Sequence, residues 1–269
     1  MNIFKKSLPV LLLLSSCEKE IHLPYRSIEP LVVIEGKINQ DTAYVRVSRT
    51  RDMDDGDRST ALLGADVRIS VDGEDILFRQ DADSVYRPSV SLKGVPGKTY
   101  TLGVKIGAHE YSSVSSMMDT VRIDSFGFRS IVAAGVKVWL YSASFQDIPG
   151  DNYYVYFLYK DGKVFAWDLF PDIGFEGGRI PIDIPVESDE EARTGEAPHD
   201  TIRDGESVRL EVRTVDRRTY DYMYSAVLTW MSSSNPVANF TTVSAGSPRA
   251  LGYFSASSSV WRTSTLHLD

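Results

Sequence analysis

Apolar and polar residues alternate with a period of two over much of the chain, as in strands that bury one face. In residues 42–50 (TAYVRVSRT), Val45 and Val47 fall on one face of a strand and Arg46 falls on the other. Similar patterns recur in residues 31–38, 100–106 and 207–216. The hydrophobic pattern therefore predicts a mainly β protein.

Turn residues divide these runs into hairpins. Asp72-Gly73 and Asp161-Gly162 each lie between two strand-like runs, and an Asp-Gly pair accepts the positive φ angles of a two-residue hairpin turn. Residues 179–186 (RIPIDIPV) contain two prolines, which cannot donate to a β ladder. We therefore predict two hairpins and an edge strand.

The hydrophobic period changes once, after Asp216. Large apolar and aromatic residues then recur at helical spacing, at Tyr220, Met223, Tyr224, Val227, Leu228 and Met231. Asp216 is a favourable N-cap residue. The pattern predicts one helix over about residues 217–233, with its apolar stripe packed on a sheet.

These elements predict two β-sandwich-like units, with the helix in the second. Residues 31–118 would form an N-terminal sandwich, immunoglobulin-like or related, and residues 119–269 a C-terminal β-rich unit. Residues 187–200 (ESDEEARTGEAPHD) are acidic and carry no large apolar side chain, so we expect a mobile loop there.

The N-terminus has the layout of a secretory leader. Two lysines precede a short apolar run that ends in Leu14-Ser15-Ser16-Cys17, and the run is too short to cross a bilayer. The last four residues resemble the lipobox of bacterial lipoproteins, which implies cleavage after residue 16 and lipid on Cys17, palmitate among its acyl chains. Residues 17–30 would then form a tether. The alternative is an ordinary buried thiol.

Composition narrows the function classes further. The leader contributes two lysines and no acidic residue to the chain's 29 basic and 37 acidic side chains, so its removal leaves a net charge of −10. This charge disfavours nucleic acid as a partner, because phosphate backbones require clustered Lys and Arg. Cys17 is the single cysteine, so the folded part contains no disulfide.

Motifs of catalysis are scarce. The histidines show no metal-ligand spacing, and neither a nucleophile elbow nor a phosphate-binding glycine loop occurs. We therefore expect no enzyme activity, cofactor or resident metal. A surface hydrolase stays open as an alternative, since Asp168 and Asp172 could supply the two carboxylates of a glycosidase.

One acidic loop raises the question of calcium. Asp52, Asp54, Asp55 and Asp57 surround Gly56, and carboxylate oxygens are the ligands that calcium prefers. The glycine stands at the fifth place, not at the sixth as in an EF-hand loop. The alternative is a solvated loop that neighbouring arginines neutralise.

Aromatic residues give the one residue-level hypothesis for a binding surface. Trp167, Phe170 and Phe175 lie in residues 167–178 (WDLFPDIGFEGG), where proline and glycines interrupt regular structure. We predict a loop that contacts a partner or ligand, because rings exposed on a loop are typical of interface hot spots. The alternative is that these rings belong to the core.

Several segments together resemble a known family. DNYYVYFLY (151–159), DRRTYDYMYSAVLTW (216–230) and GYFSASS (252–258) occur in the order found in the Bacteroidetes lipoprotein family of unknown function numbered 4249. The resemblance implies a place in the outer-membrane envelope and work beside TonB-dependent receptors. It carries over no catalytic residue.

We therefore expect a lipid-anchored outer-membrane protein, at the cell surface or on the periplasmic face. It would bind an unknown small ligand or a receptor protein and assist uptake. Two alternatives stay open, a cell-surface hydrolase acting on glycan or peptide, and a structural envelope or adhesion module.

Overall fold

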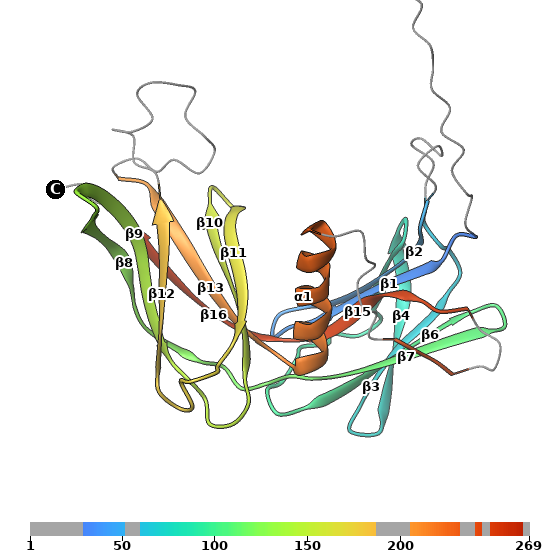
Figure 1. Cartoon of the computed structure of the whole chain (residues 1–269). Helices are drawn as coiled ribbons and strands as arrows, with labels where there is room; N and C mark the ends of the chain where they lie inside the picture. The colour runs from blue at the N-terminus through green and yellow to red at the C-terminus, as the bar shows by residue number, and fades with distance from the viewer. Residues whose placement is uncertain (1–28, 52–59, 187–204, 232–239, 244–247, 266–269) are drawn as a thin grey trace, which may run out of the picture.

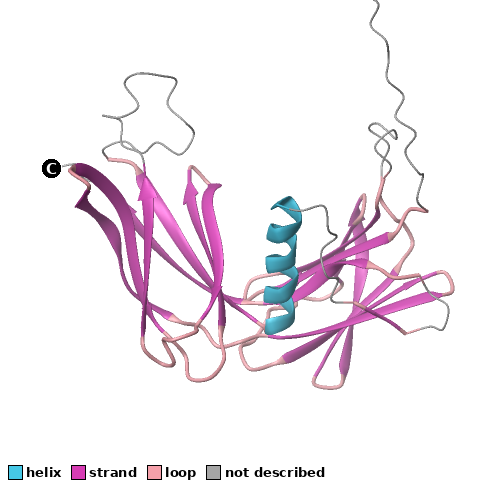
Figure 2. Cartoon of the chain, in the orientation of Figure 1, coloured by secondary structure: helices cyan, strands magenta, loops and turns pink. Residues whose placement is uncertain are grey.

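The protein is mainly β with one helix, α1, as the sequence predicted (Figures 1 and 2). The computed structural model describes residues 29–51, 60–186, 205–231, 240–243 and 248–265. Two β units lie side by side, and α1 stands between them (Figure 1).

The first unit is a single nine-stranded sheet in the order β14-β7-β6-β3-β4-β5-β2-β1-β15. It curls into a nearly closed barrel and is not a pair of stacked sheets. The Ala256 N–H on β15 donates to Ser115 Oγ on β7 at 2.8 Å, which ties the two ends of the sheet together. Its strands are β1 (Val32–Ile38), β2 (Ala43–Arg49), β3 (Asp66–Val71), β4 (Glu74–Ala82), β5 (Val85–Pro88), β6 (Thr99–Ile106), β7 (His109–Ser116), β14 (Thr241–Thr242) and β15 (Leu251–Ala256).

The alternating residues of these strands form the core of the first unit. On β1, Val32, Ile34, Gly36 and Ile38 are buried, while the residues between them are partly exposed. Ile34, Leu102 and Phe254 come from distant parts of the chain and belong to one buried cluster. Burial of each large apolar side chain contributes about 1.5–3 kcal/mol, so this alternation supplies much of the stability.

The second unit is a sandwich of a four-stranded sheet, in the order β11-β10-β13-β16, and a three-stranded sheet, in the order β12-β9-β8. Aromatic residues fill the space between the sheets, with Phe145 4.9 Å from Tyr154 and Phe128 4.1 Å from Tyr141 between ring centroids. Its strands are β8 (Arg122–Ala133), β9 (Val136–Gln146), β10 (Tyr153–Lys160), β11 (Lys163–Pro171), β12 (Arg179–Val186), β13 (Ser207–Val215) and β16 (Ser258–Thr265).

The predicted turns and the predicted edge strand are confirmed. Asp72 and Gly73, with φ angles of 53° and 82°, join β3 to β4, and Asp161 and Gly162, with φ angles of 51° and 74°, join β10 to β11. The proline-containing strand β12 lies at the edge of its sheet.

The last strands return to the first unit, which corrects the division of the chain at residue 118. Residues 119–269 do not form a separate C-terminal unit, because β14 and β15 from that range pair with β7 and β1. Only Ser257 separates β15 in the first sheet from β16 in the second unit. The two units are therefore joined by strands that cross between them.

The helix α1 (Arg217–Met231) is capped as predicted. Asp216 Oδ1 accepts a hydrogen bond from the Thr219 N–H at 2.8 Å, and Asp216 Oδ2 accepts one from Ser116 of the first unit at 3.0 Å. Tyr220 packs on Tyr153 of the second unit at 4.9 Å between ring centroids. The helix is thus fixed against both units and closes one side of the space between them.

Candidate functional site

The structure places the sequence-predicted site residues in different surroundings. Cys17, the acidic loop Asp52–Asp57 and the segment 187–200 lie outside the described residues, so lipidation stays a prediction and calcium binding an open question. Within the described ranges, no three His, Cys, Asp or Glu side chains gather closely enough to hold a metal ion.

The predicted aromatic loop is largely a strand, which corrects that interpretation. Residues 167–171 belong to β11, where Trp167 is 45% exposed and faces outward. Phe170 faces the core and lies 5.9 Å from Tyr154 between ring centroids, so it is no contact surface. Residues three apart on a strand point to opposite faces, which is why the two rings separate. Phe175, 37% exposed, lies in the turn after β11.

The buried polar residues around this turn have a structural role. Asp172 Oδ2 accepts a hydrogen bond from the Asn152 N–H at 3.0 Å, and Asn152 Nδ2 donates to the Ile148 carbonyl at 2.6 Å. Asp147 accepts hydrogen bonds from the Tyr154 hydroxyl and the Gly177 N–H. Asp172 is therefore occupied in holding two loops together.

A cavity of about 300 Å³ lies where the two units and α1 meet. We call it the junction cavity. Every part of the fold contributes to it: β1, β15 and Ser257 on the barrel side, β10 and β13 of the sandwich, and the first turns of α1. Its lining residues are Lys37, Val155, Phe157, Arg213, Val215, Thr219, Met223, Tyr253, Ser255 and Ser257.

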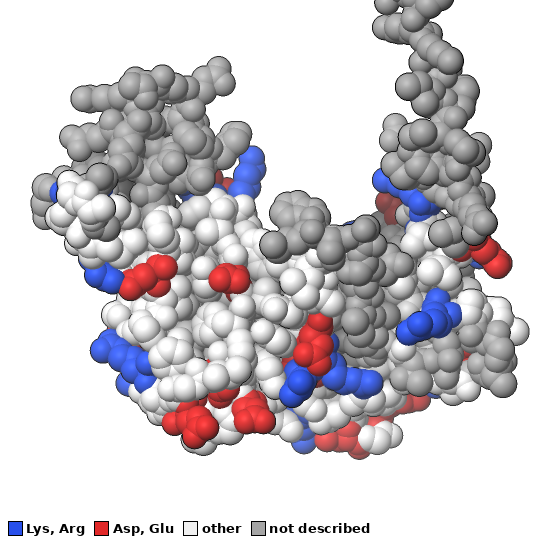
Figure 3. All heavy atoms as spheres, in the orientation of Figure 1, with Lys and Arg blue, Asp and Glu red and all other residues white. Residues whose placement is uncertain are grey.

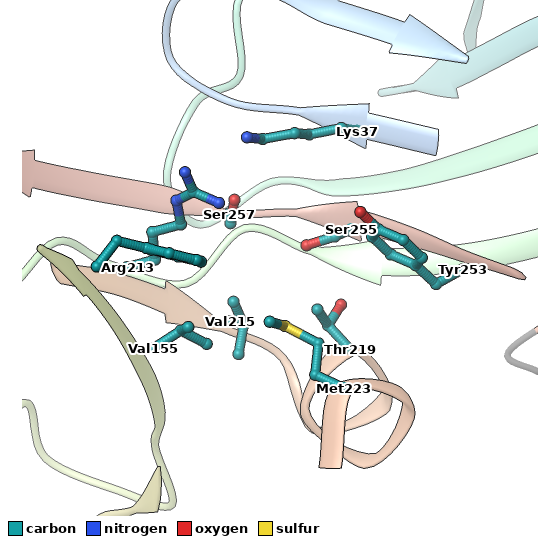
Figure 4. A pocket seen from close by; sticks show the side chains of 10 residues that line it. Lys37, Val155, Arg213, Val215, Thr219, Met223, Tyr253, Ser255 and Ser257 are labelled. Carbon is teal, nitrogen blue, oxygen red and sulfur yellow. The ribbon is translucent and has the colours of Figure 1, made fainter. Parts of the chain in front are cut away.

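Two cations approach each other across the junction cavity (Figure 4). Lys37 extends from β1 and Arg213 from β13, so they belong to different units. Burial, followed by repulsion from Arg213, lowers the pKa of Lys37 to about 8, while Glu211 acts in the opposite direction. Among the described residues, the Lys37 ammonium has no ion-pair or hydrogen-bond partner.

Glu211 neutralises the second cation. Its carboxylate is 2% exposed and accepts hydrogen bonds from Arg213 Nε at 2.5 Å and Nη2 at 2.8 Å. The Tyr159 hydroxyl donates to Glu211 Oε2 at 2.7 Å. Arg213 also lies over the Phe157 ring, 4.3 Å from its centroid. These contacts hold the guanidinium in one orientation and leave the charge of Lys37 uncompensated.

Hydroxyl groups and an apolar wall complete the junction cavity. The Thr219 hydroxyl is buried and has no hydrogen-bond partner in the described part of the chain. Ser255 and Ser257 present hydroxyls below the two cations, and Val155, Val215 and Met223 lie on the opposite side (Figure 4). Burial raises the pKa of Tyr253 to about 12, so its hydroxyl is protonated at neutral pH. The cavity therefore offers donors, one surplus positive charge and an apolar surface.

The sequence patterns missed this site because its residues come from four separate segments. The available signal was the presence of charged residues among apolar ones on two strands: VVIEGKI contains Glu35 and Lys37, and SVRLEVRTV contains Arg209, Glu211 and Arg213. Alternation predicts which face such a residue occupies, but not that two such faces meet.

Replacing Lys37 with methionine should stabilise the protein. Its lowered pKa means that the folded state disfavours the ammonium, which should cost roughly 1–3 kcal/mol at pH 7 after allowance for the partial exposure of the side chain. The gain should be full below pH 8 and vanish as the pH approaches the ordinary value of 10.5, because the wild type then folds with a neutral amine.

Thermal or urea unfolding at pH 7 and pH 10 measures this difference. Lys105→Met is the matched control, because Lys105 is exposed on the same sheet. A Lys37→Met variant no more stable than the control at pH 7 would contradict the assignment of a desolvated ammonium.

Basic and acidic side chains of the described residues are interspersed on the face shown in Figure 3, so neither sign of charge predominates there. No helix in the described part of the chain has the length and hydrophobicity that a bilayer crossing requires.

Comparison with protein families gives one match. The model of a family described as "Domain of unknown function (DUF4249)" matches residues 18–263. No match to the curated proteins was found. The matched range includes both β units, α1 and every residue of the junction cavity.

Proposed function

Since the chain belongs to the family of unknown function numbered 4249, we propose for it a role that the family name leaves open. The protein is a lipid-anchored accessory protein of the outer membrane. It holds a small ligand in the junction cavity and works with a TonB-dependent receptor in uptake, without catalysing a reaction.

The junction cavity is the observation that carries this proposal. A lysine without a partner and a buried threonine hydroxyl without a partner are costly for folding alone, since buried polar groups are normally paired. A bound anion would pair with the lysine. The position between two units and a helix is also typical of small-molecule sites.

The anchor is tested at Cys17. Replacing Cys17 with serine should move the protein from the membrane fraction into the soluble fraction and abolish labelling by a fatty-acid analogue, because serine has no thiol to carry the lipid. Ser16→Ala is the control, since it keeps a small residue before the cysteine. Equal membrane retention of the two variants would contradict lipidation.

Receptor association is tested by purification from solubilised outer membranes. The tagged wild type should copurify a TonB-dependent receptor, identified by mass spectrometry. Trp167→Ala should weaken this capture with a stability loss below about 2 kcal/mol, because Trp167 is 45% exposed and interface hot spots favour tryptophan.

Leu77→Ala provides the comparison, since Leu77 is 62% exposed on the other unit. Capture of no such receptor by the wild type would refute the partnership. Equal capture by both variants would place the contact away from Trp167.

A further inference from the structure

The charges of the junction cavity restrict what it can bind. Glu211 pairs with Arg213 through two hydrogen bonds, so Lys37 supplies the one charge left over. The groups that face Lys37 are Arg213 and Glu211 on β13, Tyr253 on β15 and Tyr44, which is paired with Lys37, on β2. Glu35 lies on the same face of β1, beside Tyr253, and is paired with Arg46 on β2, so these two charges offset each other. The lining residues of α1 are uncharged. A monoanion would balance this charge, whereas a dianion would exceed it.

A second observation, independent of the charge, concerns the hydroxyl groups that line the cavity. Thr219 is 1% exposed, and its hydroxyl has no hydrogen-bond partner among the described residues. Figure 4 shows this hydroxyl on the side of the cavity where Ser255 and Tyr253 lie. Ser255 and Ser257 lie nearer the two cations, so an oxygen anion held by Lys37 and Arg213 would accept hydrogen bonds from their hydroxyls.

The remaining wall is apolar and limits the size of the ligand. Val155, Val215 and Met223 offer no hydrogen bonds, and methionine adapts to irregular shapes. A volume of about 300 Å³ stands at the small end of the range for small-molecule sites, roughly 300–1,000 Å³. The ligand therefore has a short apolar body.

We propose, resting on the proposed function, that the ligand of the junction cavity is a small amphipathic monocarboxylate. Its carboxylate lies between Lys37 and Arg213, beside the hydroxyls of Ser255 and Ser257. Its apolar part lies against Val155, Val215 and Met223. A neutral sugar would leave Lys37 uncompensated, and a phosphate monoester would carry too much charge for the one surplus cation.

Calorimetry with three matched probes tests this proposal on the full chain in detergent. The probes are hexanoate, hexanamide and hexyl phosphate, whose unbranched alkyl chains have five, five and six carbons and whose head groups differ in charge. Hexanoate should bind at least tenfold more tightly than either of the others at pH 7. Its affinity should fall above pH 8, where Lys37 loses its proton.

Three variants locate the binding. Lys37→Met should weaken hexanoate binding at least tenfold and remove its pH dependence between pH 7 and 10, while the exposed Lys105→Met leaves both unchanged. Ser257→Ala removes the hydroxyl that lies below Lys37 and Arg213. It should weaken binding several-fold while the melting temperature stays nearly equal, which separates a ligand contact from a structural role.

The outcomes separate this proposal from the proposed function. Absence of hexanoate binding at millimolar concentration, equal binding of hexanamide, or unchanged binding by Lys37→Met would each overturn the monocarboxylate assignment. Tighter binding of hexyl phosphate would replace it with a dianion. In all these cases, capture of a TonB-dependent receptor would still support the accessory role. Conversely, if hexanoate binds as expected but no receptor is captured, the monocarboxylate assignment still holds.

Discussion

Gly252→Ala is expected to destabilise the protein by about 4 kcal/mol or more, an exceptional loss for a single added methyl group. Gly252 lies on β15, opposite Ile34 of β1. Its φ angle is +99°, and a Cβ atom there would lie 2.0 Å from the Ile34 carbonyl oxygen and 2.8 Å from its carbonyl carbon. The neighbour is backbone, so it cannot move aside without breaking the pairing that joins the C-terminal strand to the barrel.

Urea unfolding of the wild type and of two alanine variants measures this effect. Gly107→Ala is the matched control, because Gly107 also has a positive φ angle, +59°, but a Cβ atom there meets nothing within 4 Å. The control should lose only about 1 kcal/mol, the cost of the left-handed conformation. Equal losses at both glycines would show that β1 and β15 separate more easily than their geometry indicates.

Glu211→Gln should destabilise the protein by roughly 3–5 kcal/mol, the usual cost of removing one partner from a buried ion pair. Glu211 is 2% exposed and accepts hydrogen bonds from Arg213 and Tyr159. Glutamine keeps the shape of the side chain but removes its negative charge. Lys37 and Arg213 would then repel each other across the cavity with no anion between them.

Two further variants serve as comparisons for the stability loss of Glu211→Gln. Asp81→Asn removes one partner of a surface pair whose side chains are 53% and 54% exposed, and it should cost less than about 1 kcal/mol. The double variant Glu211→Gln/Lys37→Met should recover part of the loss, because it removes one of the two repelling cations. A Glu211→Gln variant as stable as Asp81→Asn would mean that water screens the pair in the cavity.

The same residues explain a conflict between stability and binding. Lys37→Met should make the protein more stable and the cavity less able to hold an anion. Such a trade-off is common where a charged group needed for function is desolvated in the folded protein. Ligand binding would offset this cost by mass action, so a saturating monocarboxylate should raise the melting temperature of the wild type more than that of the variant.

Local elements followed from the sequence, because their causes are local. Side-chain alternation predicts strands, an Asp-Gly pair accepts the two positive φ angles of a hairpin turn, and Asp216 followed by residues at helical spacing predicts α1. The family resemblance likewise depends only on residue order, and the family match over residues 18–263 agrees with it.

The placement of aromatic rings was only partly determined by the sequence. The sequence pattern predicts that Trp167 and Phe170 lie on the surface of one loop, because proline and glycines follow them closely. In the structure β11 continues to Pro171 and pairs with β10, so the two rings point to opposite faces. The pairing of β11 with β10 sets the orientation of the two rings, and a local sequence pattern does not identify the strand with which a segment pairs.

By itself, the sequence determined the strands, the hairpins and the helix with its cap, since each depends on residues within a few positions of one another. Only the tertiary structure decided that β15 pairs with β1, about 220 residues away in the chain, and that Lys37, Arg213 and Thr219 line one cavity. These outcomes depend on which buried faces fit together over the whole chain, and strand pairing of such long range is selected by global packing and not by local preference.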